Sequence, residues 1–275
     1  AVGLAGLGFD YNFKIYWRNK GFRKVLSLLP ARSVDQGMDY VVSLVEVNLA
    51  SRLVDGTVRA YQQALTLHMM PINLIGVAIS NAAFPQLAEH LGEGPNDLFQ
   101  KDLRSLLRII FWMALPVSVV IFFTRGYVVH FIRNGGNQLI AGILGCLVVA
   151  ILFRTIYHMA ARAFYARQDT KTPLYISIFS ITLNIILAIV LSMVLKMGAY
   201  GLAWAQSTVA VLEVVVLLAV MNRQMPKLFD MTFVRAIFKM IIAGTVTGVV
   251  CYIAVLIMPF RYHDDSFFSA FPKFV

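Results

Sequence analysis

Long apolar stretches, separated by short segments rich in charged, glycine and proline residues, make up most of the chain. A helix that crosses the hydrocarbon core of a bilayer needs about 20 mostly apolar residues. The pattern predicts seven such helices, of which the first is the most polar. They are expected at 33–54, 60–88, 106–132, 138–163, 173–195, 199–221 and 234–258. The predicted fold class is therefore an all-α integral membrane protein with about seven transmembrane helices.

The composition supports a membrane protein and excludes several other classes. Of the 275 residues, 59% are hydrophobic and 14% are charged, and the mean hydropathy is +0.73. A soluble domain is about 45–50% apolar and about 25% charged. The two cysteines, Cys146 and Cys251, lie in apolar stretches without the spacing of a metal site or a disulfide framework. A soluble enzyme, a disordered tail and a secreted disulfide scaffold are all excluded.

The basic residues predict the orientation in the membrane. The formal net charge is +10, and an excess of Lys and Arg is typical of cytoplasmic loops that face anionic lipids. If the segment 10–32 is cytoplasmic, most basic residues fall on that side. Those after this segment are Lys101, Arg104, Arg108, Arg162, Arg167, Lys171, Arg223, Lys227, Arg235 and Lys239. Membrane lipids, and no nucleic acid, are the partners expected from this charge.

A stripe of basic side chains inside the fourth predicted span is a candidate substrate site. Arg154, Tyr157, His158 and Arg162 are spaced so that they share one face of a helix. Such residues are costly in a membrane unless they are paired or hydrated. Guanidinium groups bind phosphate through paired N–H donors. We therefore predict that Arg154, His158 and Arg162, together with Arg52 near the end of the first span, line a substrate cavity.

Oxygen-bearing side chains in other spans are candidates for a coupling cation. Asp39 and Glu46 share one face of the first span, and Asn184 is central in the fifth. Oxygen ligands suit hard cations. The alternative is structural, for example an ion pair between Glu46 and Arg154 that only holds the bundle together. For Glu213, central in the sixth span, the sequence favours neither interpretation.

Enzyme signatures are absent from the sequence. It contains no HExxH, GxSxG or Walker motif, and the five histidines are scattered. Neither an enzyme nor a cofactor is expected, and no metal site beyond a candidate sodium site. An intramembrane enzyme, whose catalytic pair would come from separate helices, is a distant alternative.

Four segments carry a resemblance to a known family. They are AFYARQDTKTP (163–173), LASRLVDGTVRAYQQALTLHMMPINLIGVAISNAAFPQLAE (49–89), LRIIFWMALP (107–116) and GAYGLAWAQS (198–207). The chain resembles the MurJ/MviN lipid II flippases of the multidrug/oligosaccharidyl-lipid/polysaccharide exporter superfamily. The first of the four segments is the most specific.

The resemblance implies an architecture. Members of the family have fourteen spans, in two six-helix lobes plus two further helices. The chain is similar to the second half of such a protein, the second lobe of a two-lobed transporter. Residues 1–32 are then the end of a truncated helix and a basic cytoplasmic linker, 33–222 are the six-helix second lobe, and 223–275 are an additional C-terminal helix and tail. The first lobe would be supplied by the missing N-terminal part of the same protein.

The resemblance also implies a function. It is the movement of undecaprenyl-linked peptidoglycan precursor, lipid II, across the bacterial cytoplasmic membrane by alternating access, with Na⁺ or H⁺ as coupling ion and no covalent chemistry. Alternatives are the export of another lipid-linked oligosaccharide or a drug, and a non-transporting membrane scaffold.

Individual residues agree only in part with the family pattern. Thr66 occupies the position of an arginine that faces the central cavity in the family, so that headgroup contact is not expected here. Asp39, Glu46 and Asn184 match a sodium site of some members, but Ala188 lacks the expected oxygen.

The segment around residue 170 is the most specific part of the resemblance. Its polar residues Arg167, Asp169 and Lys171 precede Pro173, which is suited to the first turn of a helix. They are predicted to form a cytoplasmic hairpin, which is either a plain turn or a latch for the inward-closed state.

Overall fold

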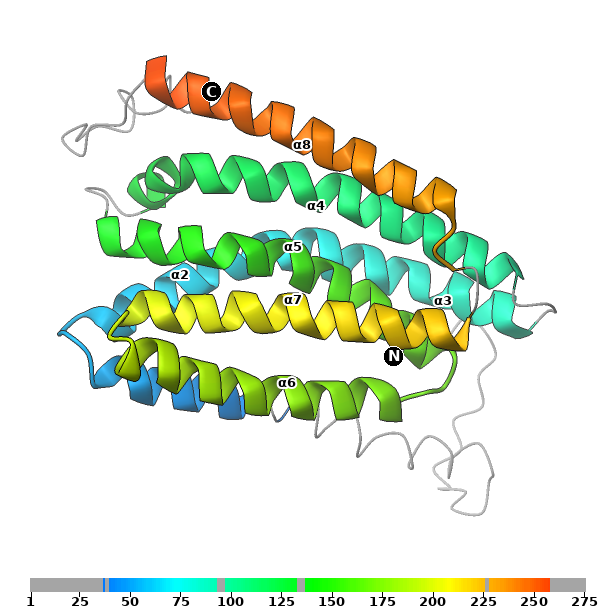
Figure 1. Ribbon diagram of the computed structural model, residues 1–275, viewed down its shortest axis with the longest axis horizontal. Helices are drawn as coiled ribbons and strands as arrows, with labels where there is room; N and C mark the ends of the chain where they lie inside the picture. Colours follow the sequence, from blue (N-terminus) through cyan, green and yellow to red (C-terminus); the bar gives the residue numbers. More distant parts are fainter. Residues whose placement is uncertain (1–36, 38–39, 93–96, 133–136, 226–227, 258–275) are drawn as a thin grey trace, which may run out of the picture.

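The computed structural model describes residue 37 and residues 40–92, 97–132, 137–225 and 228–257, which form long helices arranged side by side in a bundle (Figure 1). Among these residues, six helices are long and apolar enough to cross a membrane. They are α2 (Thr57–Pro71) continued by the π-helical segment η2 (Ile72–Val77) and α3 (Ala78–Gly92), α4 (Asp97–Ile132), α5 (Gln138–Ala166), α6 (Lys171–Ile189) with η3 (Val190–Val194), α7 (Ala199–Gln224) and α8 (Met231–Ile257).

Of the first predicted span, the structure describes residue 37 and the residues from 40 onward. Within 33–54, the structure describes an apolar helix over Tyr40–Ser51, which is too short to count among the six. It ends because the chain turns, with the Arg52 and Leu53 amides donating to the carbonyls of Leu49 and Ala50. Gly56, at a φ of 84°, then leads into α2. Asp39 lies outside the described residues.

Prolines alter the second span without interrupting it. Pro71 is the last residue of α2 and is followed directly by η2. A proline inside a helix leaves a carbonyl without its usual partner, and local π adjustments are one way in which membrane helices accommodate this. η2 lies very close to α5, because a Cβ on Gly76 would be only 3.0 Å from Thr155 Cα.

α5 is the central helix of the bundle. It contacts α7, α4 and the α2–η2–α3 span (Figure 1). Of its most apolar stretch of 18 residues, 56% is buried. For α8 the corresponding share is 6%, because among the described elements this helix packs mainly along α4, at the side of the bundle. The apolar surface of α8 fits contact with lipid, whereas α5 is enclosed by protein and can hold polar side chains away from lipid.

The start of α8 is fixed to α4 by polar contacts. Arg104 Nε donates to the Leu228 carbonyl at 2.9 Å, and its Nη1 lies 2.6 Å from Asp230 Oδ2. Hydrogen bonds from the Thr232 side chain and the Phe233 amide hold the pKa of Asp230 below its usual value. These contacts lie at the end of the bundle that the basic residues predict to be cytoplasmic.

Candidate functional site

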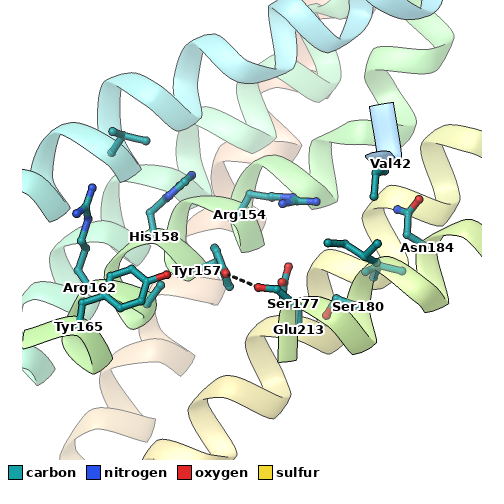
Figure 2. A pocket seen from close by; sticks show the side chains of 14 residues that line it. Val42, Arg154, Tyr157, His158, Arg162, Tyr165, Ser177, Ser180, Asn184 and Glu213 are labelled. Atoms are coloured by element: carbon teal, nitrogen blue, oxygen red, sulfur yellow. Dashed lines mark hydrogen bonds between the residues drawn. The ribbon is translucent and has the colours of Figure 1, made fainter. Parts of the chain in front are cut away.

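One wall of a polar cavity is formed by α5. The cavity has a volume of about 290 Å³, and α5 contributes Arg154, Tyr157, His158 and Arg162, spaced by one helical turn or two (Figure 2). Tyr165 extends this wall by another turn. The stripe deduced from the sequence therefore faces a cavity between helices and not lipid.

The opposite wall comes from α6 and α7. Ser177, Ser180 and Asn184 lie along one face of α6, and Glu213 projects from α7. The two walls meet where the hydroxyls of Tyr157 and Ser177 are hydrogen-bonded at 3.1 Å. Apolar lining is provided by Val42 of the helix Tyr40–Ser51, Val77 of η2, Ala161, Ile181 and Val209.

The cavity contains both positive and negative groups. Arg154 and Arg162 bring guanidinium groups, and Glu213, which is 5% exposed, brings a carboxylate. Arg154 extends across the cavity toward the side formed by Val42 and Asn184 (Figure 2). The Arg162 guanidinium carbon is 6.0 Å from the centre of the Phe84 ring. This arrangement can bind a phosphate through the arginines and a small cation through the carboxylate and its neighbouring oxygens.

Asn184 is a buried polar residue of the cavity whose side chain is unsatisfied. It is 2% exposed, and neither its Oδ1 nor its Nδ2 has a hydrogen-bond partner among the described residues. A buried amide without partners is destabilising unless something else occupies its hydrogen-bonding positions. Asn184 is therefore a good candidate for contact with a bound ion or ligand.

Glu46 belongs to a separate buried cluster. It is not among the residues that line the cavity, and it is 1% exposed. Its carboxylate accepts hydrogen bonds from Gln206 Nε2, at 3.0 and 2.9 Å, and from the Tyr61 hydroxyl, at 3.0 Å. The structure thus does not bring Glu46 and Asn184 to one cavity, and both Glu46 oxygens already have donors.

Arg52 also lies apart from the other substrate candidates. It is exposed on the turn after the helix Tyr40–Ser51, and it does not line the cavity. The reason is the early end of that helix, which leaves Arg52 beyond its last turn. In the part of the chain that the structure describes, no group of three or more His, Cys, Asp or Glu side chains could hold a metal ion.

The hairpin between α5 and α6 is ordered by its own side chains. Asp169 Oδ1 accepts from the Thr172 amide at 3.0 Å and Oδ2 accepts from the Thr172 hydroxyl at 2.6 Å. Burial acts to raise the pKa of Asp169, but hydrogen bonds from Thr172 outweigh it and lower the pKa below its usual value. Arg167 Nη1 donates to Gln224 Oε1 at 2.6 Å and so connects the hairpin to the end of α7.

Pro173 lies in the first turn of α6, where a missing N–H breaks no helical hydrogen bond. Lys171 is the first residue of that helix and is exposed.

Several residues that line the cavity were not predicted as site residues from the sequence. Ser177 and Ser180 precede Asn184 by about two turns and one turn on α6, so a search for polar residues on the Asn184 face would have found both. Tyr165 continues the α5 stripe in the same way. The sequence shows Glu213 as a charged residue in the middle of a span. Its place in the same cavity as the arginines follows from the packing of α7 against α6 and α5.

The fold is that of the transporters of the multidrug/oligosaccharidyl-lipid/polysaccharide (MOP) exporter superfamily. A solved lipid II flippase MurJ, in an inward closed conformation, matches with a TM-score of 0.71 and 20% identity over 95% of this chain and 55% of that chain. A MOP superfamily transporter from Pyrococcus furiosus matches with a TM-score of 0.69 and 11% identity, covering 87% of this chain and 55% of that chain.

The chain belongs to the MurJ family, because the family model described as lipid II flippase MurJ matches residues 2–270. A probable lipid II flippase MurJ of Borreliella burgdorferi is 26% identical over 73% of this chain and 40% of that protein. The Thermotoga maritima relative, also a probable lipid II flippase MurJ, is 26% identical over 84% of this chain and 47% of that protein. The chain thus spans about half the length of these relatives. With six helices able to span a membrane among the residues that the structure describes, it is a multi-pass protein of the bacterial inner membrane.

Proposed function

We propose that this chain is the second lobe of a flippase that moves lipid II across the cytoplasmic membrane by alternating access, without covalent chemistry. The observation that carries the proposal is the cavity of a MurJ family member that Arg154, Arg162 and Glu213 line together inside a membrane bundle. Guanidinium groups in a site shielded from bulk water bind phosphate strongly. Lipid II carries a pyrophosphate, which such a site suits.

The proposal includes a first lobe supplied by the same protein, since curated relatives are about twice as long as the matched region. A cavity that is alternately open to either side of the membrane needs two lobes that move against each other. The chain alone is expected to be inactive, and the chain reconstituted with the first half of the Thermotoga maritima relative is expected to be active.

The test is the translocation of fluorescent lipid II in proteoliposomes that contain both halves. Arg154→Gln and Arg162→Gln are each expected to slow transport by about tenfold, because a charge-assisted contact to phosphate is lost. Arg223→Gln is the matched control, since Arg223 is exposed at the end of α7. If both cavity variants transport like the unmodified protein, the scaffold interpretation is favoured instead.

The coupling ion is proposed to be Na⁺ or H⁺ acting at Asn184 and Glu213. The support is that the unsatisfied Asn184 amide and the buried Glu213 carboxylate line the same cavity. Glu46 acts in this proposal as a fixed part of the bundle, because its oxygens are hydrogen-bonded to Gln206 and Tyr61. Replacing Na⁺ by choline at constant pH separates the two ions: sodium coupling predicts a loss of transport and proton coupling predicts none.

A second candidate function is the export of a different lipid-linked oligosaccharide. It is favoured by Thr66, which is exposed on α2 and whose hydroxyl donates to the Gln62 carbonyl of the same helix at 2.9 Å. A neutral side chain at this position would contribute less to binding an anionic headgroup than the arginine of the family pattern. Competition by unlabelled lipid-linked oligosaccharides with different headgroups distinguishes the two substrates.

A further inference from the structure

A second cavity, of about 760 Å³, lies at the end of the bundle opposite the predicted cytoplasmic side. It is formed where the last turns of α4 and α8 come near the first turns of α5 and α7, and Figure 1 shows these four helix ends at the same end of the bundle. Its characteristic residues are Phe122, Phe123, Arg125, Gln138, Tyr200 and Tyr252. None of its lining residues is shared with the cavity around Arg154.

Arg125 is the cation of this second cavity. Its Nη1 donates to the Phe122 carbonyl at 2.6 Å, and its guanidinium carbon is 4.6 Å from the centre of the Phe122 ring. Within the described residues, no carboxylate forms an ion pair with it. A charged guanidinium beside aromatic rings near the membrane end of a helix is favourable when an anion neutralises it. Among the described residues, its other N–H groups make no hydrogen bond that would compete with such an anion.

Two glycines of α5 make room for the polar lining. A Cβ on Gly142 would be 2.6 Å from Cε1 of Tyr200, and a Cβ on Gly145 would be 3.0 Å from Cδ of Arg125. Both side chains therefore lie directly on the α5 backbone, where any larger residue would displace them. Arg125 and Tyr200 are held in the cavity wall by packing.

The aromatic lining indicates the kind of ligand. Tyrosines at the ends of spanning helices prefer the headgroup level, where their rings are in apolar surroundings and their hydroxyls reach water. Tyr200 and Tyr252 are both partly exposed there, at 38% and 54%. An amphiphile with an anionic head and apolar chains complements a guanidinium surrounded by aromatic rings.

We propose that this cavity binds an anionic phospholipid of the leaflet on the non-cytoplasmic side. The lipid phosphate is held by Arg125 and the Gln138 amide, and the glycerol and upper acyl chains lie against Phe122 and Tyr252. The ligand is a bilayer lipid and not the transported substrate, and the site is independent of the proposed function. A lipid bound here would connect α8 to the ends of α4, α5 and α7.

The test is native mass spectrometry of the purified chain titrated with palmitoyl-oleoyl phosphatidylglycerol or with the zwitterionic phosphatidylcholine of the same chains. We expect the phosphatidylglycerol complex to be tighter, and Arg125→Gln to weaken it about tenfold while leaving phosphatidylcholine unaffected. Arg59→Gln is the control, because Arg59 is exposed at the same end of the bundle on α2. Its phosphatidylglycerol affinity is expected to match that of the unmodified chain.

A milder variant keeps the test valid if Arg125→Gln does not fold. Tyr252→Ala alters an exposed side chain on α8, and it is expected to weaken both lipids by a similar factor. The proposal is overturned if the two lipids bind equally to the unmodified chain, or if Arg59→Gln and Arg125→Gln lower affinity alike. It is also overturned if inorganic phosphate or undecaprenyl phosphate displaces phosphatidylglycerol at equal concentration, since the site would then recognise a free anion or the substrate.

Discussion

The side-chain amide of Gln206 donates to both carboxylate oxygens of Glu46, at 3.0 and 2.9 Å, and so joins α7 to the helix Tyr40–Ser51. Tyr61 of α2 donates to the same carboxylate at 3.0 Å. Three helices thus meet at one buried acidic group. The helix Tyr40–Ser51 is fixed to the bundle by this contact.

Gln206→Leu is therefore expected to destabilise the protein by about 1–3 kcal/mol, because a buried carboxylate loses its amide donor without regaining water. Thermal unfolding in detergent, followed by circular dichroism, measures the effect. Gln62→Leu is the control, since Gln62 is exposed on α2. Equal melting temperatures for the two variants would show that the Glu46 contact is not important for stability.

Asn184→Leu is expected to have the opposite effect on stability. The amide of Asn184 is buried and has no protein partner among the described residues, so an apolar side chain of similar size removes an unfavourable group. We expect a gain of about 1 kcal/mol together with a loss of transport, the usual compromise at a functional site. A stabilised variant with normal transport would show that Asn184 is not part of the proposed ion site. Melting temperature and lipid II translocation are measured on the same preparation.

Gly201→Ala tests the close contact between α7 and η3. An added Cβ would be 2.6 Å from the Leu191 carbonyl carbon and 2.7 Å from the Ser192 nitrogen, which are backbone atoms that cannot turn away. We expect a destabilisation of about 3 kcal/mol, at the high end for overpacking. At Gly248 the nearest atoms are at 3.5 Å, so Gly248→Ala is the matched control with little expected change. Unfolding in a denaturant compares the two variants.

Hydropathy predicted most of the spanning helices because the preference for lipid is a property of each residue and can be read from the sequence directly. The span expected at 138–163 is α5, Gln138–Ala166, and the one at 199–221 is α7, Ala199–Gln224. The prediction failed where a helix continues beyond the apolar region. α4 begins at Asp97, well before the expected residue 106, because its polar first turns are stabilised by contacts such as that of Arg104 with Asp230.

The candidate site could be predicted only along single helices. The spacing of Arg154, His158 and Arg162 placed them on one face, since helical periodicity is local. Which helices stand opposite that face depends on how the helices pack. The sequence therefore could not show that Glu213 lines the same cavity, and the structure was needed to show it. For the same reason the sequence did not reveal the hydrogen bonds that Gln206 and Tyr61 donate to Glu46.

The hairpin before α6 gives the protein a pH-dependent element. The folded-state pKa of Asp169 is lowered because hydrogen bonds from Thr172 outweigh the effect of burial, so the charged carboxylate stabilises the fold above the unfolded value of 3.8. That contribution is lost as the pH falls through the lower, folded-state pKa. Asp169→Asn is thus expected to lower the melting temperature near neutral pH, with a difference that shrinks below about pH 4. Glu89→Gln, at an exposed position on α3, is the control. A difference for Asp169→Asn that is constant between neutral and acidic pH would contradict the stabilising role of this charge.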